Sequence, residues 1–313
     1  GAAEKANLPI RLQVAEAVVA LAGRKAFLQE AAAAILLQLL APLTPAHLQS
    51  ALTDAPLLTE WLQGSGPEQL HVLLRLLPSL PASVLAASPL MPDQTAAADP
   101  TAAIFSRSHL EGQLAEVLKQ TSSAHPRMHS LWATVLSLLV PGLEVNATGR
   151  VLTKASPHNS KSKEEVKKAL VARHPETEAL WEVVVEEALI GSSHERKYLA
   201  FSLFEALLPY MEGGRAAGLF SRGFVQCLVN NLRKGDNYLH KRAHACAHTI
   251  VQYCQHTMDP AARVAITTAL QQFAGGRFDT LTGTKTVARL AALQGSDHSS
   301  AALHFTALKE TFL

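Results

Sequence analysis

Apolar residues recur with the period of an α-helix in three successive segments of the last third of this chain. The segments span about residues 217–234, 237–256 and 260–274, and their apolar positions follow spacings near i, i+4, i+7, i+8 and i+11. Such spacings align side chains along one side of a helix. Three helices of similar length, each with one apolar face and joined by short turns, predict a stacked helical array. The apolar positions are Phe220, Phe224, Cys227, Leu228 and Leu232; Leu239, Ala243, Cys246, Ala247, Ile250 and Cys254; and Ala262, Ile266, Ala269, Leu270 and Phe273.

Helical periodicity extends over most of the remaining chain. The segment 193–211 is apolar almost all round, which indicates a helix covered on several sides, as an inner helix of a solenoid is. No alternating run flanked by a tight-turn pair supports a sheet. We therefore predict an all-α fold, an armadillo/HEAT-like helical-repeat solenoid. The other expected helices lie near 10–22, 26–41, 45–52, 56–63, 67–77, 109–120, 129–140, 163–173, 176–190, 282–293 and 300–312.

Several helix ends carry recognisable capping residues. Thr44 and Asp259 each precede a proline, the arrangement of an N-cap residue before a proline in the first turn. Ser192 with Glu195 matches the capping box, in which each side chain satisfies a backbone N–H group of the other residue. Gly191 would then end the preceding helix in a left-handed conformation.

Two irregular stretches interrupt the predicted array, and we expect both to be mobile loops. Residues 86–103 are rich in Ala, Pro and Asp, whereas residues 141–163 mix Pro, Gly, Ser, Asn and Lys. They suggest an N-terminal helical-repeat half (1–140), a basic flexible linker (141–163) and a C-terminal helical-repeat half (164–313). Because the pattern is helical from the start and the first residue is not a methionine, we expect the chain to be part of a longer polypeptide.

The composition agrees with packed helices and narrows the class of protein. Of the 313 residues 48% are apolar and only 5% are aromatic, whereas β-rich proteins use more aromatic and β-branched side chains. No apolar run reaches the ~18 residues of a membrane span, and no secretory leader is visible. The three cysteines, Cys227, Cys246 and Cys254, indicate reduced core thiols in an intracellular protein.

The net charge of +2 is unevenly distributed along the chain. Between Arg150 and Arg173, seven basic residues stand against two acidic ones, a local net charge of +5. A second basic cluster surrounds the turn before the helix expected at 237–256, where Asp236 opposes it. Each cluster is either a solvated surface or a sequence-independent contact for nucleic-acid phosphates or an acidic partner. The candidate binding residues are Lys154, Lys161, Lys163, Lys167 and Lys168 in the first cluster, and Arg233, Lys234, Lys241 and Arg242 in the second.

A row of histidines, His240, His244 and His248, repeats every four residues near two cysteines, which raises the alternative of a zinc site. The helical phase argues against it. Cys246 and Cys254 belong to the apolar stripe, whereas His244 and His248 fall on the opposite, polar face. A tetrahedral set of ligands must converge on one side. We interpret the histidines as neutral surface residues, and predict no metal and no other cofactor.

Candidate catalytic motifs are weak. The segment Gly283–Thr284–Lys285–Thr286 lacks the spacing of a phosphate-binding loop and is better interpreted as the first turn of the helix near 282–293. No G-x-S-x-G motif or Cys–His context suggests a nucleophile, and no Asp-x-Asp element suggests two-metal phosphoryl transfer. We predict a protein that is not an enzyme and has no small-molecule substrate.

Several ordered blocks of sequence resemble the DNA polymerase phi / Myb-binding protein 1A family, most closely its plant-type members. The two strongest blocks are 192–201, which reads SSHERKYLAF, and 276–279, which reads GRFD and continues through TKTV at 284–287. The blocks occur in order over nearly the whole chain, and their joint order carries the resemblance. The remaining blocks are 14–16 (VAE), 24–30 (RKAFLQE), 55–61 (APLLTEW) and 125–132 (HPRMHSLW).

The resemblance implies an armadillo/HEAT-like protein of the nucleolus, associated with ribosomal DNA, ribosomal RNA synthesis and ribosome biogenesis. Animal relatives are also described as transcription co-regulators. Family members are much longer, so functions of their additional N-terminal segment and charged tails do not transfer to this chain. The family name implies a polymerase, but this sequence supplies no residues for that chemistry. Arg196 and Asp279, in the strongest blocks, are expected to be cap or inter-helix ion-pair residues.

Together these observations predict a non-enzymatic scaffold of the nucleus, within the nucleolus, that regulates rDNA transcription and takes part in ribosome biogenesis. Its partners would be proteins of the nucleolar transcription or pre-ribosome machinery, with rDNA or rRNA contacted through the basic patches and no membrane involved. Two alternatives stay open. One is a transport- or adaptor-type solenoid that binds peptides without nucleic acid, and the other is a DNA polymerase, as the family name implies.

Overall fold

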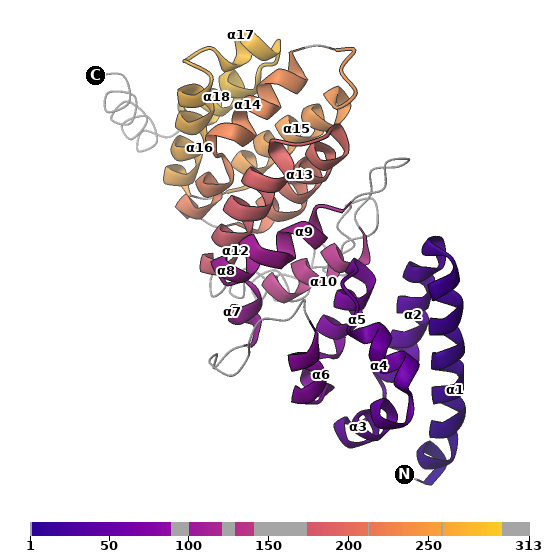
Figure 1. Ribbon diagram of the computed structural model, residues 1–313. Helices are drawn as coiled ribbons and strands as arrows, with labels where there is room; N and C mark the ends of the chain where they lie inside the picture. The colour runs from indigo at the N-terminus through magenta and orange to yellow at the C-terminus, as the bar shows by residue number, and fades with distance from the viewer. Residues whose placement is uncertain are drawn as a thin grey trace. The chain divides into compact units, whose positions relative to one another are not determined.

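Every regular element described in the computed structural model is a helix, which confirms the predicted all-α fold for that part of the chain (Figure 1). The chain divides into two compact units, residues 1–120 with 129–138 and residues 121–128 with 139–313. The linker expected at 141–163 and the helices expected near 163–173 and 300–312 lie outside the described residues. None of the described helices is long and apolar enough to cross a membrane. The described residues are 2–88, 100–120, 129–140, 174–211, 213–233, 235–257 and 259–295.

The first unit is built on α1 (Ala2–Arg24) and α2 (Gln29–Leu40), which pack against each other, while α2 also packs against α5 (Pro67–Leu76). Trp61 Nε1 donates to Gln29 Oε1 at 3.2 Å and so ties α4 to the start of α2. The other elements of this unit are η1 (Ala26–Leu28), α3 (Pro45–Asp54), α4 (Pro56–Leu62), η2 (Leu77–Ser79), α6 (Ala82–Ala87), α7 (Pro100–Ile104), α8 (Arg107–His109), η4 (Leu110–Leu114), α9 (Ala115–Leu118) and α10 (Ser130–Leu139).

Two polar contacts hold α10 in the first unit. Trp132 is fully buried, and its Nε1 donates to the carbonyl oxygen of Leu118 at 3.0 Å. His71 Nδ1 of α5 forms a hydrogen bond of 2.6 Å with Thr134 Oγ1 of α10. Burial and the neighbouring Arg75 guanidinium lower the pKa of His71 to about 4. The imidazole is therefore neutral at physiological pH, which allows it to lie between two packed helices.

The second unit has an aromatic core. α12 (His174–Leu180) continues into the π-helical η5 (Trp181–Ile190). The helices α13 (His194–Leu207) and α14 (Arg222–Leu232) pack against η5, whereas η7 (Gly213–Leu219) packs against α16 (Pro260–Phe273). The rings of Phe204 and Phe224 stack with centroids 4.5 Å apart, and Trp181 meets Phe224 edge-on at 5.5 Å. Such ring pairs are a large source of core stability. The cluster consists of Trp181, Phe201, Phe204, Phe220 and Phe224.

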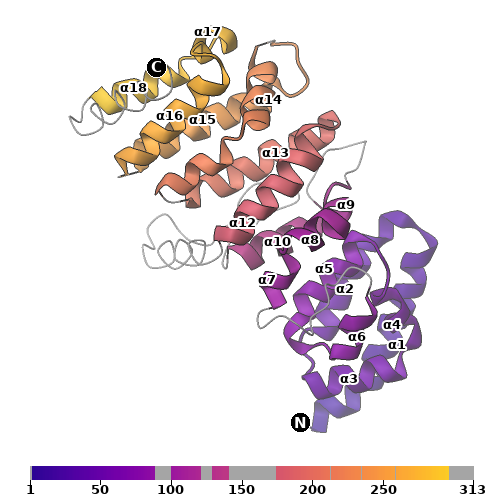
Figure 2. The same cartoon turned by 60° about the vertical axis from the view of Figure 1, so that its left-hand side comes forward.

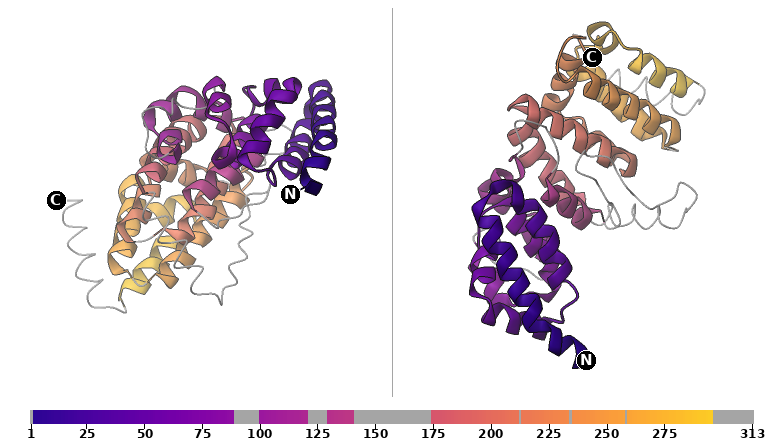
Figure 3. Two further views of the ribbon diagram at one scale, coloured as in Figure 1. Left: turned by 90° about the horizontal axis from the view of Figure 1, so that it is seen from below. Right: turned by 90° about the vertical axis from the view of Figure 1, so that its right-hand side faces the viewer.

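The helix α13 is covered on several sides, as its apolar composition predicted. Every residue from Leu199 to Leu207 except Glu205 is buried. α13 packs against η5 and α15 (His240–His256), α15 packs against α18 (Thr286–Gly295), and the helices lie as neighbouring rods within this unit (Figures 2 and 3). The remaining elements of the unit are η6 (Leu208–Tyr210) and α17 (Phe278–Thr282).

The predicted caps are confirmed at two helices and wrong at a third. Thr44 Oγ1 accepts from the backbone of His47 at 3.3 Å, and Asp259 Oδ1 accepts from Ala261 N at 2.9 Å. At α13 the cap is Ser193 rather than Ser192, because Ser193 is the last residue with extended backbone. Ser192 Oγ instead accepts from Arg196 Nη1 at 2.8 Å, and the inter-helix ion pair or cap expected of Arg196 stays a prediction.

The glycine predictions need one correction. Gly191 has φ −75° and is not left-handed. Left-handed glycines instead surround α17, and Gly283, with φ 68°, ends that helix. The chain turns sharply there, and α18 begins at Thr286 rather than at about residue 282.

Asp279 joins α17 to α18. Its Oδ1 accepts from Val287 N at 3.0 Å and its Oδ2 from Ala288 N at 2.9 Å. Thr284 Oγ1 also donates to Oδ1 at 3.3 Å. The carboxylate thus satisfies two of the N–H groups that the start of α18 would otherwise leave without partners. The expectation that Asp279 is a capping residue is confirmed.

Candidate nucleic-acid interface and an acidic pocket

The structure places only part of the predicted basic surface. Lys154, Lys161, Lys163, Lys167 and Lys168 lie outside the described residues, as does Lys234. Arg233, Lys241 and Arg242 remain at the connection between α14 and α15. We call residues 233–241 the basic loop.

The ends of the basic loop are held together by local hydrogen bonds. His240 Nδ1 bonds the carbonyl oxygen of Asn231 at 3.1 Å, which links the last turn of α14 to the first turn of α15. Asn237 Oδ1 accepts from Leu239 N at 3.2 Å, an Asx turn that shapes the loop before α15. Arg233 and Lys241, which flank these anchors, are both exposed. The loop therefore presents two cations on one connection.

Arg242 has a different role from its neighbour Lys241. Its Nη1 lies 3.2 Å from Glu205 Oε2 of α13, and both side chains are only 19% exposed. Its guanidinium also lies over the ring of Tyr198, 5.1 Å from the centroid. Burial raises the pKa of Glu205, and the Arg242 charge partly offsets that effect. Arg242 therefore joins α15 to α13, which leaves Arg233 and Lys241 as the exposed cations among the candidates that the structure describes.

An exposed aromatic ring, which the sequence analysis did not select, lies on the basic loop. Tyr238 is 64% exposed, and its ring centroid lies 6.3 Å from that of His194 at the start of α13. Rings beside cations are typical of surfaces that bind single-stranded nucleic acid, because bases stack on the ring while phosphates meet the cations. A tyrosine between Lys234 and Lys241 was the signal in the sequence.

The histidine row lies on the solvent side of α15. His244 and His248 are exposed beside Lys241, while Cys246 and Cys254 are buried, as the helical phase predicted. Burial raises the pKa of Cys254 to about 12. Over the described ranges, no group of three or more His, Cys, Asp or Glu side chains is arranged to hold a metal ion. The ring centroids of His240 and His244 are 5.0 Å apart.

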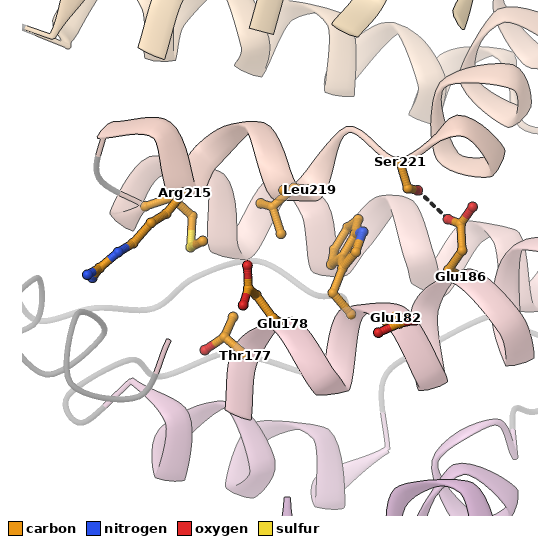
Figure 4. A pocket seen from close by; sticks show the side chains of 10 residues that line it. Thr177, Glu178, Glu182, Glu186, Arg215, Leu219 and Ser221 are labelled. Atoms are coloured by element: carbon orange, nitrogen blue, oxygen red, sulfur yellow. Dashed lines mark hydrogen bonds between the residues drawn. The ribbon is translucent and has the colours of Figure 1, made fainter. Parts of the chain in front are cut away.

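A pocket of about 360 Å³ lies in the second unit between the α12–η5 helix and η7 (Figure 4). Figure 4 shows Glu178, Glu182 and Glu186 on one helix, with Glu178 pointing toward the segment that carries Arg215 and Leu219, and Glu186 toward Ser221. The three glutamates occur every four residues and outnumber the single arginine. We call this the acidic pocket. Its lining residues are Thr177, Glu178, Trp181, Glu182, Glu186, Met211, Arg215, Gly218, Leu219 and Ser221.

Glu186 at one end of the acidic pocket also holds α14 in place. Ser221 Oγ donates to Glu186 Oε2, and Gly223 N donates to Oε1 at 2.8 Å. The carboxylate thus lies at the N-terminal end of a helix, where negative charge is favourable. Glu178 and Glu182 are exposed along the same row.

Trp181 lines the acidic pocket and belongs to the aromatic core at the same time. Its side chain is 4% exposed, and its Nε1 is buried without a hydrogen-bond partner. A buried indole N–H group usually has an acceptor. Sequence analysis missed the pocket, although the spacing of Glu178, Glu182 and Glu186 around a tryptophan was visible.

Comparisons with known proteins agree on one family. A family model described as DNA polymerase phi matches residues 4–313. The rDNA transcriptional regulator POL5 of Saccharomyces cerevisiae is 26% identical over 189 residues, 58% of this chain and 17% of that protein. The rDNA transcriptional regulator pol5 of Schizosaccharomyces pombe is 30% identical over 115 residues, 36% of this chain and 12% of that protein. The chain thus matches only a small part of these relatives. No solved structure matches it.

Proposed function

The chain belongs to the DNA polymerase phi family, and from this premise we propose that it is a non-enzymatic scaffold in the regulation of rDNA transcription. The similar yeast proteins are named as rDNA transcriptional regulators rather than as polymerases, which supports this reading. In this proposal the helices stack as an armadillo/HEAT-like array, a form that offers a long surface for several partners. The protein works in the nucleolus and also contributes to ribosome biogenesis.

The observation that carries the nucleic-acid part of the proposal is the basic loop. Arg233 and Lys241 are exposed on the same loop as the exposed ring of Tyr238, whereas Arg242 is paired with Glu205. Such a surface contacts phosphates without reading base sequence. Its affinity for rDNA or rRNA therefore depends strongly on salt and little on the sequence of the probe. The five lysines from Lys154 to Lys168 add charge to the same interaction.

Salt titration of binding tests this proposal. The wild-type chain and the variant Arg233→Gln/Lys241→Gln are titrated against labelled rDNA duplex and rRNA fragments at several salt concentrations. Loss of two phosphate contacts should reduce the slope of log K against log salt by roughly 1–2. The variant Lys285→Gln/Arg289→Gln is the charge-matched control, because both side chains are exposed near the start of α18. Equal slopes in all three proteins would remove the basic loop from the proposal.

The contribution of Tyr238 is separated from charge by a second pair of variants. Tyr238→Phe keeps the ring, whereas Tyr238→Ala removes it. If bases stack on this ring, Tyr238→Ala should weaken binding to single-stranded RNA by about fivefold or more, and Tyr238→Phe should bind as the wild type does.

The polymerase alternative is tested by primer extension with Mg²⁺ and nucleotides. Extension that is lost on substituting a carboxylate of this chain would overturn the non-enzymatic proposal.

A further inference from the structure

We propose that the acidic pocket is a docking site for an extended peptide segment of a partner protein, with lysine or arginine side chains at alternate positions. This goes beyond the contact with nucleic acid proposed for the basic loop. Phosphates would be repelled by the glutamates that line this pocket, so the two surfaces select partners of opposite charge.

The charge and length of the glutamate row suit a basic peptide. Glu178, Glu182 and Glu186 span eight residues of helix, a length of about 10–12 Å, because the part from Trp181 on is π-helical and rises less per residue than an α-helix. This is too long for the carboxylates to surround one metal ion. In an extended peptide, side chains on one face recur roughly every 7 Å. Two basic side chains at alternate positions therefore match the spacing of two neighbouring glutamates, about 6 Å along the helix, and their negative charge.

The acidic pocket also has an apolar lining beside its glutamates. Met211 and Leu219 are buried side chains that line the pocket from η6–η7, and Trp181 lines it from η5. Lysine and arginine carry an apolar stem below the charged group, and the stem packs on such a surface while the charge stays at the rim. A tryptophan ring adds a favourable contact for the cation.

A buried N–H group in the lining points to a ligand independently of the glutamate row. Trp181 Nε1 is a buried donor without an acceptor, in a side chain that is 96% buried and lines the pocket. A buried donor without a partner carries a desolvation cost that an acceptor removes. The backbone carbonyl group of an extended peptide supplies such an acceptor. The pocket therefore favours a peptide, which brings cations and carbonyl groups together, over a free cation.

The test uses the full chain and a fluorescein-labelled peptide of ten residues with alternating lysine and serine. Fluorescence polarisation measures its affinity, and a peptide with glutamine in place of lysine is the probe control. Glu178→Gln/Glu182→Gln should weaken binding of the lysine peptide by about tenfold at low salt. Glu187→Gln is the matched control, because Glu187 is exposed on the same helix and does not line the pocket. Glu186 is left unchanged because it holds α14.

The outcomes separate the proposal from its rivals. Loss of affinity in the double variant alone, with unchanged thermal unfolding, supports the pocket. Equal loss in Glu187→Gln would mean that the peptide binds the acidic surface without a site, and an unchanged double variant would also overturn the proposal. The variant Trp181→Phe removes the N–H group and keeps a ring. It should bind the lysine peptide about threefold more weakly than the wild type does. Wild-type affinity in this variant would contradict the role given to Nε1. Binding of rRNA should be the same in all these variants, so a failure here does not affect the proposed function.

Discussion

Removing the Asp279 carboxylate should destabilise the second unit by a measurable amount. Asp279 accepts from two backbone N–H groups at the start of α18, at 3.0 and 2.9 Å. Loss of a capping side chain costs about 1 kcal/mol, with a range of about 0.5–2. The negative charge at a helix N-terminus contributes about 0.3–1 kcal/mol more. We therefore expect Asp279→Ala to lower the free energy of unfolding by about 2 kcal/mol.

Urea unfolding followed by circular dichroism measures this effect. With a slope of about 2 kcal/mol per molar urea, the midpoint should fall by about 1 M. Asp279→Asn keeps one acceptor oxygen but turns an amide donor toward a backbone N–H group, and should lose about 1 kcal/mol. Asp236→Ala, in the exposed basic loop, is the control and should stay within about 0.5 kcal/mol of the wild type. A loss for Asp279→Ala no larger than that of the control would refute the reasoning.

Three further predictions concern titration, an ion pair and thiol reactivity. The free energy of unfolding should fall by up to about 3 kcal/mol as pH is lowered from 6.5 to 4, because His71 takes up a proton in the unfolded chain before it does in the folded one. The variant His71→Gln should lose that part of the pH dependence. Equal pH profiles of wild type and variant would contradict the prediction. Arg242→Ala should lower the free energy of unfolding by about 2–3 kcal/mol, because it leaves the half-buried Glu205 without its partner. The neighbouring variant Lys241→Ala should lower it by less than about 0.5 kcal/mol, and thermal unfolding measures both. The three buried thiols are those of Cys227, Cys246 and Cys254. They should react with a disulfide reagent at pH 8 only after urea is added. Rapid labelling of the folded chain would count against their burial.

Features that depend on neighbours along the chain could be predicted from the sequence. The apolar stripe of α15, with Cys246 and Cys254 buried and His244 and His248 exposed, follows from helical phase alone. The caps at Thr44 and Asp259 also depend only on the next few residues. At α13 the capping-box spacing selected Ser192, whereas the adjacent Ser193 is the cap, and only the backbone conformation decides between the two serines.

Features that depend on packing between distant segments could not be predicted in this way. Arg242 was grouped with the exposed cations, although it lies four residues before Cys246 and therefore on the edge of the buried stripe. Its partner Glu205 lies 37 positions earlier in the sequence, on α13. The acidic pocket requires η7 to lie opposite the glutamate row, and no local pattern places a 3-10 segment there.

The bond between Glu186 and the backbone of Gly223 leaves little room for a side chain at position 223, at the start of α14. A methyl group at position 223 would collide with the oxygen of Glu186 that accepts from this backbone. Alanine is normally a harmless replacement within a helix. Here it would displace the Glu186 carboxylate from the backbone N–H group that donates to it. The same displacement would rearrange one end of the cavity, which Glu186 lines. A change at this glycine would thus alter the shape and charge of the cavity from a position that does not itself line it.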